Sequence, residues 1–339
     1  MKADKINGLQ IRRKVQLYTL YDAPQEGIRE NTPELIMMRL IENGEASEVA
    51  DLFPDHKQFS TASPVVDAPY GQFEGKQEIR EFAEGFIERF KADGLTVLPM
   101  FQTRSGGRSV TEVVLNFEVN GVIDQVPMFV VADLCAGNKM DEVRLYTHAT
   151  FVPDLTPYRR PLFHSAHLEM GDPGLMTGAM REYYTALHHV PSVDVDRILA
   201  CMHPDCIFGG YAVDNGEADA DHDPEALRKT YEGMATYIPS KVGMRYETLI
   251  DDGVTGVIEW VHVIADAGRN DLGRIAMSGV SSYMRGEDGR LISIRISDYA
   301  YMEKYIDWSK AGITMEEALK INAVKEFPAG VGSKKQEEL

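Results

Sequence analysis

The chain carries one strand-like pattern twice, as Val110-Thr111-Glu112-Val113-Val114-Leu115-Asn116-Phe117-Glu118-Val119 and again as Val254-Thr255-Gly256-Val257-Ile258-Glu259-Trp260-Val261-His262-Val263. The two stretches align without a gap. Alternating side-chain character over such a length is typical of a β-strand with one face turned toward a core. Self-similarity of this kind predicts two copies of one structural unit within the chain.

The elements expected around each copy occur in the same order. An amphipathic helix comes first, followed by a short helix, a Pro-Asp pair, a short extended piece, a third helix and three or four strands. In the first half we expect helices over 33–43 and 46–53, a third helix around Phe82 and a last strand over 143–150. In the second half we expect helices over 176–189 and 193–202, a third helix around Tyr231 and a last strand over 291–298. Helices followed by consecutive antiparallel strands predict an α+β fold. We therefore expect two tandem cone-shaped barrels, each with three helices packed in a curved antiparallel sheet and each hollow enough for a small molecule.

The length of 339 residues fits two domains of about 150 residues each. Four prolines between residues 152 and 175 disfavour both helix and central strand, which predicts a linker there. We expect the chain to consist of five parts: an N-terminal arm over 1–30, a first domain over 31–151, a Pro-rich linker over 152–175, a second domain over 176–308, and a C-terminal helix and tail over 309–339.

Composition restricts the partners and the location of the chain. Lys and Arg number 35 against 53 Asp and Glu, so the net charge is −18, which disfavours nucleic acid and anionic membranes as partners. No apolar run approaches the ~20 residues of a membrane span, and the N-terminus has no secretion-signal pattern. The 3 cysteines form neither a zinc motif nor a disulfide framework. We expect a cytoplasmic protein with no metal and no cofactor.

One segment carries a family resemblance. The run Val65-Val66-Asp67-Ala68-Pro69-Tyr70-Gly71-Gln72-Phe73-Glu74-Gly75-Lys76-Gln77-Glu78-Ile79-Arg80-Glu81-Phe82 resembles the ketosteroid-isomerase pattern, in which a strand ends in Asp-Pro-aromatic-Gly before helix three. More broadly, residues 33–151 and 176–305 look like SnoaL-like domains of the nuclear transport factor 2-like superfamily. The resemblance implies a cone-shaped α+β barrel. It also implies a cofactor-independent enzyme such as an isomerase, cyclase, dehydratase or lyase, although many relatives only bind ligands or proteins.

The resemblance also implies roles for single residues. Asp67 falls on the proton-shuttling carboxylate of the family, with Tyr70 beside it as a substrate-binding residue, and Tyr184 matches the tyrosine of helix one. An isomerase also has an acid on a late strand, where this chain has Val130 and Ser281. Neither half has the complete isomerase set, so another acid–base reaction is favoured over double-bond isomerisation.

Strand alternation predicts the pocket of the first domain. Val113, Leu115 and Phe117 should face the pocket and bind substrate, while Glu112, Asn116 and Glu118 point outward. Tyr146 and His148 share a face of the last strand and should join Asp67 as catalytic groups. An apolar cup raises the pKa of a carboxyl group and makes it a useful base near neutral pH.

The same alternation predicts a polar cavity in the second domain. Val257, Glu259 and Val261 should point inward, as should Ile294, Ile296 and Asp298, with Ile258 and Trp260 packing outward; a shift of one residue would bring His262 inward instead of Glu259. Two carboxyl groups with different pKa values can divide the acid and base roles. The expected set is Tyr184, Glu259 and Asp298 as catalytic residues, with Tyr211, Ser281 and Tyr283 binding substrate.

These observations predict a cofactor-independent lyase. It would remove water from a hydroxylated aromatic or polycyclic molecule, such as a lignin-derived diarylpropane diol. From suitable substrates it would also remove a one-carbon unit such as formaldehyde. One alternative is a ketone isomerase or polyketide-type cyclase that moves a proton with Asp67. The other is a non-catalytic module that binds a ligand or a protein. The duplication predicts an intramolecular pseudo-dimer, with further homo-oligomerisation open.

Overall fold

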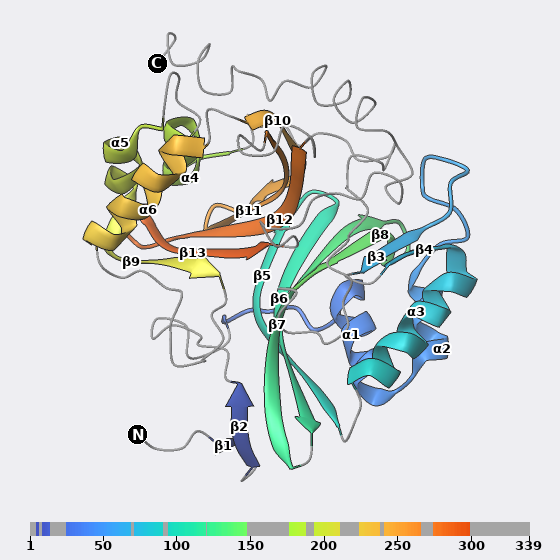
Figure 1. Ribbon diagram of the computed structural model, residues 1–339. Helices are drawn as coiled ribbons and strands as arrows, with labels where there is room; N and C mark the ends of the chain where they lie inside the picture. The colour runs from blue at the N-terminus through green and yellow to red at the C-terminus, as the bar shows by residue number, and fades with distance from the viewer. Residues whose placement is uncertain are drawn as a thin grey trace. The chain divides into compact units, whose positions relative to one another are not determined.

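The computed structural model describes residues 5–6, 9–13, 25–68, 71–90, 94–119, 121–147, 176–187, 193–210, 224–237, 241–265 and 274–298. These residues belong to two compact units, one ending at Thr147 and the other running from Met176 to Asp298 (Figure 1). Both units combine helices with an antiparallel-rich sheet, so the fold class is mixed α+β.

The helices of the first unit begin and end where local signals predict. They are α1 (Pro33–Asn43), α2 (Ala46–Val49) with a 3-10 turn over Ala50–Leu52, and α3 (Gly75–Phe90). Proline at the first position of α1 suits the fixed φ angle of a helix start. Gly44 ends α1 with a φ of 80°, a left-handed conformation that glycine adopts without strain.

The sheet of the first unit is built around three long strands. Its strands are β1 (Lys5–Ile6), β2 (Leu9–Arg13), β3 (Val65–Ala68), β4 (Gly71–Glu74), β5 (Leu95–Ser105), β6 (Arg108–Val119), β7 (Val122–Cys135) and β8 (Lys139–Tyr146). They pair in the order β5-β6-β7-β8-β3-β4, and β2 runs parallel beside the start of β7. The connection between β6 and β7 uses Gly121 at a φ of 74°, as the Asn-Gly pair predicts.

The second unit has a similar order of elements, although its described residues contain no counterpart of β1, β2 or β4. Its helices are α4 (Gly178–Leu187), α5 (Val195–Ala200) and α6 (Pro224–Tyr237), and its strands are β9 (Met202–Gly210), β10 (Lys241–Asp251), β11 (Thr255–Ala265), β12 (Arg274–Arg285) and β13 (Leu291–Asp298). The strand order is β10-β11-β12-β13-β9. In both units the last strand pairs in parallel with the first strand after the two helices, β8 with β3 and β13 with β9.

Neither sheet closes into a barrel through the strand pairs of the described residues, because the edge strands pair on one side only. The expected cone-shaped barrels are therefore open sheets with helices on one face. An open sheet has two distinct faces, so side chains on opposite faces of a strand cannot line the same pocket.

The face of the first sheet that packs on the helices is apolar. Val113, Leu115 and Phe117 of β6 lie in the same buried core as Met38 of α1 and Phe82 of α3. The alternation predicted from the sequence for β6 is therefore confirmed. Glu112 and Asn116 lie on the other face, yet they are only 1% and 8% exposed, so that face is shielded from solvent as well.

The face predicted for β11 in the second unit is wrong by one residue. Ile258 belongs to the core shared with the helices, and a Cβ added at Gly256 would lie 1.9 Å from Met180 Sδ of α4. Gly256 and Ile258 therefore face the helices, whereas Val257 and Glu259 face away from them. The gap-free alignment of the repeat pairs Val113 with Val257, and a slip of one residue reverses every side chain.

The face predicted for β13 agrees with the structure. Ile294 lies in the helix-facing core and Ile296 packs against it, while Arg295 and Ser297 lie on the opposite face. Several sequence expectations fall outside the described residues: the linker over 152–175 and the C-terminal helix and tail. The same holds for the side chains of Trp260, Val261 and His262, and the pseudo-dimer and the domain limits stay predictions.

Candidate functional site

Asp67 does not share a face with the apolar pocket expected around it. Its neighbours Val66 and Ala68 lie in the helix-facing core, so Asp67 and Val65 project from the other face of β3. Asp67 is 6% exposed, and its register partner on β8 is Arg144. Ala68, directly before Pro69 in the sequence, takes the helix-facing position instead.

Tyr146 lies with Asp67 on that other face. Leu145 belongs to the helix-facing core, which turns the adjacent Tyr146 away from the helices; the tyrosine is fully buried. The structure thus brings Asp67 and Tyr146 to one face and separates both from Val113, Leu115 and Phe117. His148 and Tyr70, the other two residues of the expected first site, lie outside the described residues.

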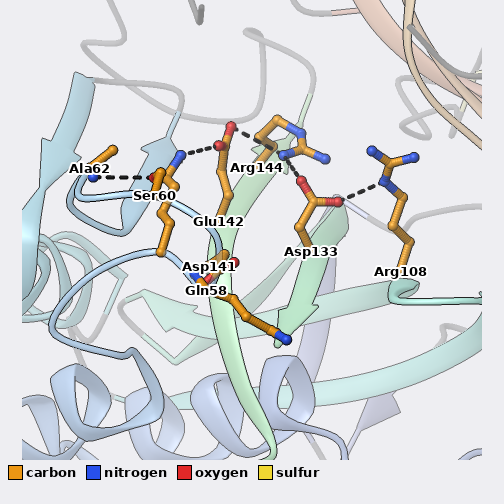
Figure 2. Close-up of polar contacts among 9 residues, drawn as sticks. Gln58, Ser60, Ala62, Arg108, Asp133, Asp141, Glu142 and Arg144 are labelled. Atoms are coloured by element: carbon orange, nitrogen blue, oxygen red, sulfur yellow. Dashed lines mark hydrogen bonds and ion pairs between the residues drawn. The ribbon is translucent and has the colours of Figure 1, made fainter. Parts of the chain in front are cut away.

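A chain of alternating charges crosses this face (Figure 2). Lys57 Nζ lies 2.7 Å from Glu142 Oε2, Arg144 Nη1 lies 3.2 Å from Glu142 Oε1 and 2.9 Å from Asp133 Oδ2, and Arg108 Nε lies 2.9 Å from Asp133 Oδ1. Burial would raise the pKa of Asp133, but the guanidinium groups of Arg144 and Arg108 outweigh it and lower that pKa. Every charge in the chain has an opposite neighbour, which is the pattern of a structural ion-pair network.

The helix-facing side of the first unit contains a buried acid that the sequence did not single out. Glu34, in the first turn of α1, is fully buried and accepts hydrogen bonds from Ser109 and Thr111 of β6 and from Gln102 of β5. An acidic residue in a first helical turn normally faces solvent and complements the helix dipole. No sequence signal therefore distinguishes Glu34 from an ordinary surface residue.

Four tyrosines meet in the helix-facing core of the second unit. Tyr183 and Tyr184 come from α4, Tyr231 from α6 and Tyr283 from β12. The Tyr283 ring lies 5.2 Å from that of Tyr183 and 6.1 Å from that of Tyr184, centroid to centroid. Such separations allow favourable tilted and edge-on contacts between aromatic rings. Tyr184 and Tyr283 are residues expected from the sequence; Tyr183 and Tyr231 are not.

Two of these phenols are hydrogen-bonded to each other. Tyr183 Oη lies 3.0 Å from Tyr231 Oη, and both rings are buried. Complete burial, reinforced by the adjacent Tyr183 hydroxyl, raises the pKa of Tyr231 well above that of a free phenol. Tyr231 therefore keeps its proton near neutral pH, and the phenol that accepts within the pair retains a proton that it can donate to a third atom.

The other residues expected at this site are divided between the two faces. Ser281 is 2% exposed and shares its face with Tyr283 two residues later on β12. Glu259 is fully buried on the opposite face, with Arg295, whose guanidinium donates to Ser293 Oγ at 2.9 Å and Ser282 Oγ at 2.7 Å. Glu259 is therefore corrected from a cavity residue to one on the far side of the sheet. Tyr211 and the side chain of Asp298 lie outside the described residues.

A carboxylate clamp fixes the helix that carries Tyr183 and Tyr184. Asp251 at the end of β10 accepts from the backbone N–H and hydroxyl of Thr177, directly before α4, and from both terminal nitrogens of Arg285 on β12. Burial acts to raise the pKa of Asp251, but hydrogen bonds from Arg285, Gly253 and Thr177 lower it overall. The clamp thus sets the position of α4 against the sheet.

The described residues contain neither a cluster of metal-ligand side chains nor a membrane-spanning helix. No three His, Cys, Asp or Glu side chains within the described ranges come together in a way that could hold a metal ion. Across the same ranges, every helix is too short or too polar to cross a bilayer.

Comparisons with known proteins give structural matches alone. No protein-family model matches the chain, and no curated protein sequence does either. A hypothetical protein of ketosteroid isomerase-like fold from Catenulispora acidiphila, in complex with trimethylamine, is similar at 14% identity over 33% of this chain and 82% of that chain, with a TM-score of 0.28. An epoxide hydrolase/cyclase-like enzyme of pyran ring formation in the polyether salinomycin is similar at 13% identity over 36% and 94%, with a TM-score of 0.29. An NTF2-like protein of unknown function from Cytophaga hutchinsonii is similar at 11% identity over 36% and 93%, with a TM-score of 0.27.

Proposed function

We propose that the protein is an acid–base enzyme whose second unit binds a small, largely apolar molecule that carries oxygen. The observation behind this proposal is the pair of hydrogen-bonded phenols, Tyr183 and Tyr231, inside an aromatic core. A phenol that stays protonated in an apolar surrounding is a strong hydrogen-bond donor to a substrate oxygen, because water does not compete there.

The reaction proposed is a lyase reaction, the dehydration of a hydroxylated aromatic or polycyclic substrate. A phenol of the Tyr183–Tyr231 pair donates its proton to the departing hydroxyl group, and a base removes a proton from the adjacent carbon. A carbon–carbon double bond forms and water leaves. From a substrate with a hydroxymethyl group on the adjacent carbon, the base would instead remove the O–H proton of that group. The carbon–carbon bond to the hydroxymethyl group then breaks, its electron pair forms the double bond as the protonated hydroxyl group departs, and formaldehyde leaves together with water. We propose Asp298, at the end of β13, as the base, and Tyr184, Ser281 and Tyr283 as groups that orient the substrate.

The experiment follows product mass. Purified protein is incubated with aromatic diols, hydroxylated polycyclic ketones and diarylpropane diols, and products are analysed by mass spectrometry. Loss of the mass of water or formaldehyde supports the lyase. Tyr231→Phe should then lower kcat about 100-fold with a smaller change in KM, since general-acid catalysis contributes on that scale. Glu225→Gln, an exposed ion-pair residue on the same helix, is the matched control and should leave kcat unchanged.

One alternative reaction takes place in the first unit. A ketone isomerase or cyclase there would form and stabilise an enolate, and its product would have an unchanged mass. In that mechanism Asp67 moves the proton, and Asp67→Asn should abolish turnover while Tyr231→Phe should not, because the two residues belong to different units. The two variants therefore also identify which unit is active.

A non-catalytic binding module is favoured by one further observation. Among the described residues of the second unit, the most deeply buried carboxylate, Glu259, lies on the face away from the tyrosines. Binding of an aromatic ligand that quenches tyrosine fluorescence, without conversion of any substrate, would support this alternative and refute the lyase.

A further inference from the structure

The first unit contains a carboxyl group that is only half satisfied. Glu34 is fully buried, and three donors converge on its Oε1 atom: Ser109 Oγ at 2.5 Å, Thr111 Oγ1 at 3.1 Å and Gln102 Nε2 at 3.4 Å. A carboxylate oxygen has two lone pairs, so three donors saturate this atom.

The second oxygen of the same carboxyl group has no such partner. Glu34 Oε2 is buried and makes no hydrogen bond with the described residues. Buried polar atoms in folded proteins are nearly always hydrogen-bonded, and an exception points to a bound group or a functional role. All the groups around Oε1 are neutral donors, so the carboxyl group also lacks a countercharge within this cluster.

The buried cations of the unit are held elsewhere. Lys57 and Arg144 are the most shielded cations among the described residues of the first unit, and both are paired with Glu142 on the face away from the helices. Glu34 lies on the helix-facing side with Thr111, whose neighbour Val113 on that side of β6 belongs to the apolar core. Neither of these two buried cations is available to Glu34, so we take the completing cation to come from a ligand.

The surroundings of Glu34 indicate what kind of cation that is. One helical turn further along α1, Met37 and Met38 are fully buried in the apolar core. The segment before α1 crosses over Gln102, because Gln102 N donates to Gln25 Oε1 and Arg29 N donates to Gln102 Oε1. A group that reaches Oε2 would thus meet a carboxyl oxygen that is shielded from solvent and lies close along the helix to apolar side chains. Such a site suits an N–H donor attached to an apolar body, and strongly hydrated inorganic cations suit it poorly.

We propose that Glu34 is the anchor of a second binding site, in which Oε2 accepts a hydrogen bond from the N–H of a small organic ammonium ion with an apolar substituent. The site lies in the first unit, so it is independent of the tyrosine core assigned to the lyase reaction. Its ligand differs in charge from the neutral hydroxylated substrates proposed there.

Titration calorimetry with matched pairs of compounds tests this site. Methylammonium, tert-butylammonium and benzylammonium are each compared with the alcohol of the same carbon skeleton. The wild-type protein should bind at least one ammonium ion about 10-fold or more tightly than its alcohol, because a charge-assisted hydrogen bond is about twice as strong as a neutral one. Titrations at high ionic strength remove unspecific attraction to a chain of net charge −18.

Glu34→Gln is the matched variant, since it keeps an oxygen acceptor for Ser109 and Thr111 and removes the charge. It should lose the preference for the ammonium ion over the alcohol. Glu112→Gln is the control: Glu112 is 1% exposed and lies on the same strand as Thr111 but on the opposite face, so this change should leave the preference intact. Equal affinities for ammonium and alcohol in the wild type, the absence of any binding, or an unchanged preference in Glu34→Gln would each overturn the proposal. The wild-type comparison decides even where the variant does not fold.

Discussion

Replacing Asp251 by Asn tests whether the carboxylate clamp holds the second unit together. The side chains of Asp251 and Arg285 are 3% and 8% exposed, and their contact is bidentate. Removing one member of a buried ion pair leaves the other charge uncompensated and costs about 3–5 kcal/mol. Arg285 Nε already has no partner among the described residues, and Nη2 would keep only the longer, uncharged contacts with the carbonyl and hydroxyl oxygens of Thr177. Because Asn keeps one oxygen acceptor for Gly253 N–H, we expect the lower end, about 3 kcal/mol.

The loss should appear as a lower melting temperature of the second unit. For a domain of roughly 100 residues, 1 kcal/mol shifts Tm by about 4–8 °C, so Asp251→Asn should lower that transition by about 12–24 °C. Differential scanning calorimetry measures the shift, and hydrogen exchange of the α4 amides assigns it to this unit.

The control is an exposed ion pair between the same two residue types. Arg228 Nη2 lies 2.7 Å from Asp196 Oδ1, but the side chains are 44% and 82% exposed. Exposed pairs contribute at most about 1 kcal/mol, so Asp196→Asn should change Tm by only a few degrees. Equal shifts in the two variants would refute the argument, because burial would then have no part in the strength of the clamp.

Three further changes have definite expected outcomes. Gly256→Ala should destabilise the second unit by about 1–3 kcal/mol in urea unfolding, because the added Cβ would clash with Met180 Sδ. Gly233→Ala, where α6 leaves open space for a Cβ, should stabilise the unit by about 0.5–1 kcal/mol. A change of the same sign in both variants would contradict the packing described. The pKa of Asp133 is lowered in the folded state, so its contribution to stability is present above the unfolded pKa of about 4 and is lost as the pH falls toward the lower folded pKa. Asp133→Asn should therefore lose less stability than wild type as the pH falls below about 4, and parallel losses would count against the network. Burial raises the pKa of Cys206 to about 12, so iodoacetamide should modify it slowly in the native protein at pH 8 and rapidly in urea, and rapid native labelling would disprove its shielding.

The order of elements could be predicted because it depends on local signals. Pro33 and Gly44 bound α1 at the residues expected, and the turn at Gly121 joins the strands that the Asn-Gly pair predicts. The antiparallel part of each sheet follows from this order, since consecutive antiparallel strands need only short turns. The parallel pairs of β3 with β8 and of β9 with β13 do not follow from it.

The facing of side chains was harder to predict, because alternation has a period of two and any slip reverses it. On β6, an apolar residue at every second position from Val113 marks the core face. On β11, Val257 and Ile258 are both apolar, so composition does not distinguish the two faces, and the aligned repeat led to the wrong one. Gly256, which has no side chain and so leaves space for Met180, marks the helix-facing side of β11. A pattern based on apolar side chains does not detect it.

Asp67 and Glu34 illustrate the same difficulty at the level of sites. A motif match placed Asp67 in the interior although Ala68 takes the core-facing position. Glu34 belongs to no motif. It is buried because β5 and β6 cross the start of α1, as its hydrogen bonds with Gln102 and Ser109 show. Long-range packing of this kind is not present in any local window of sequence.

The parallel pairing at the edge of each sheet has a consequence for synthesis. β3 pairs with β4 on one side and with β8 on the other, whereas β9 has its neighbour in β13. The pairing of each early strand is therefore complete only after the final strand of its unit has been translated. Pairings between such distant segments are slow to form. A nascent chain halted before β13 would therefore expose one side of β9, which makes that ribosome-bound intermediate a natural client for chaperones.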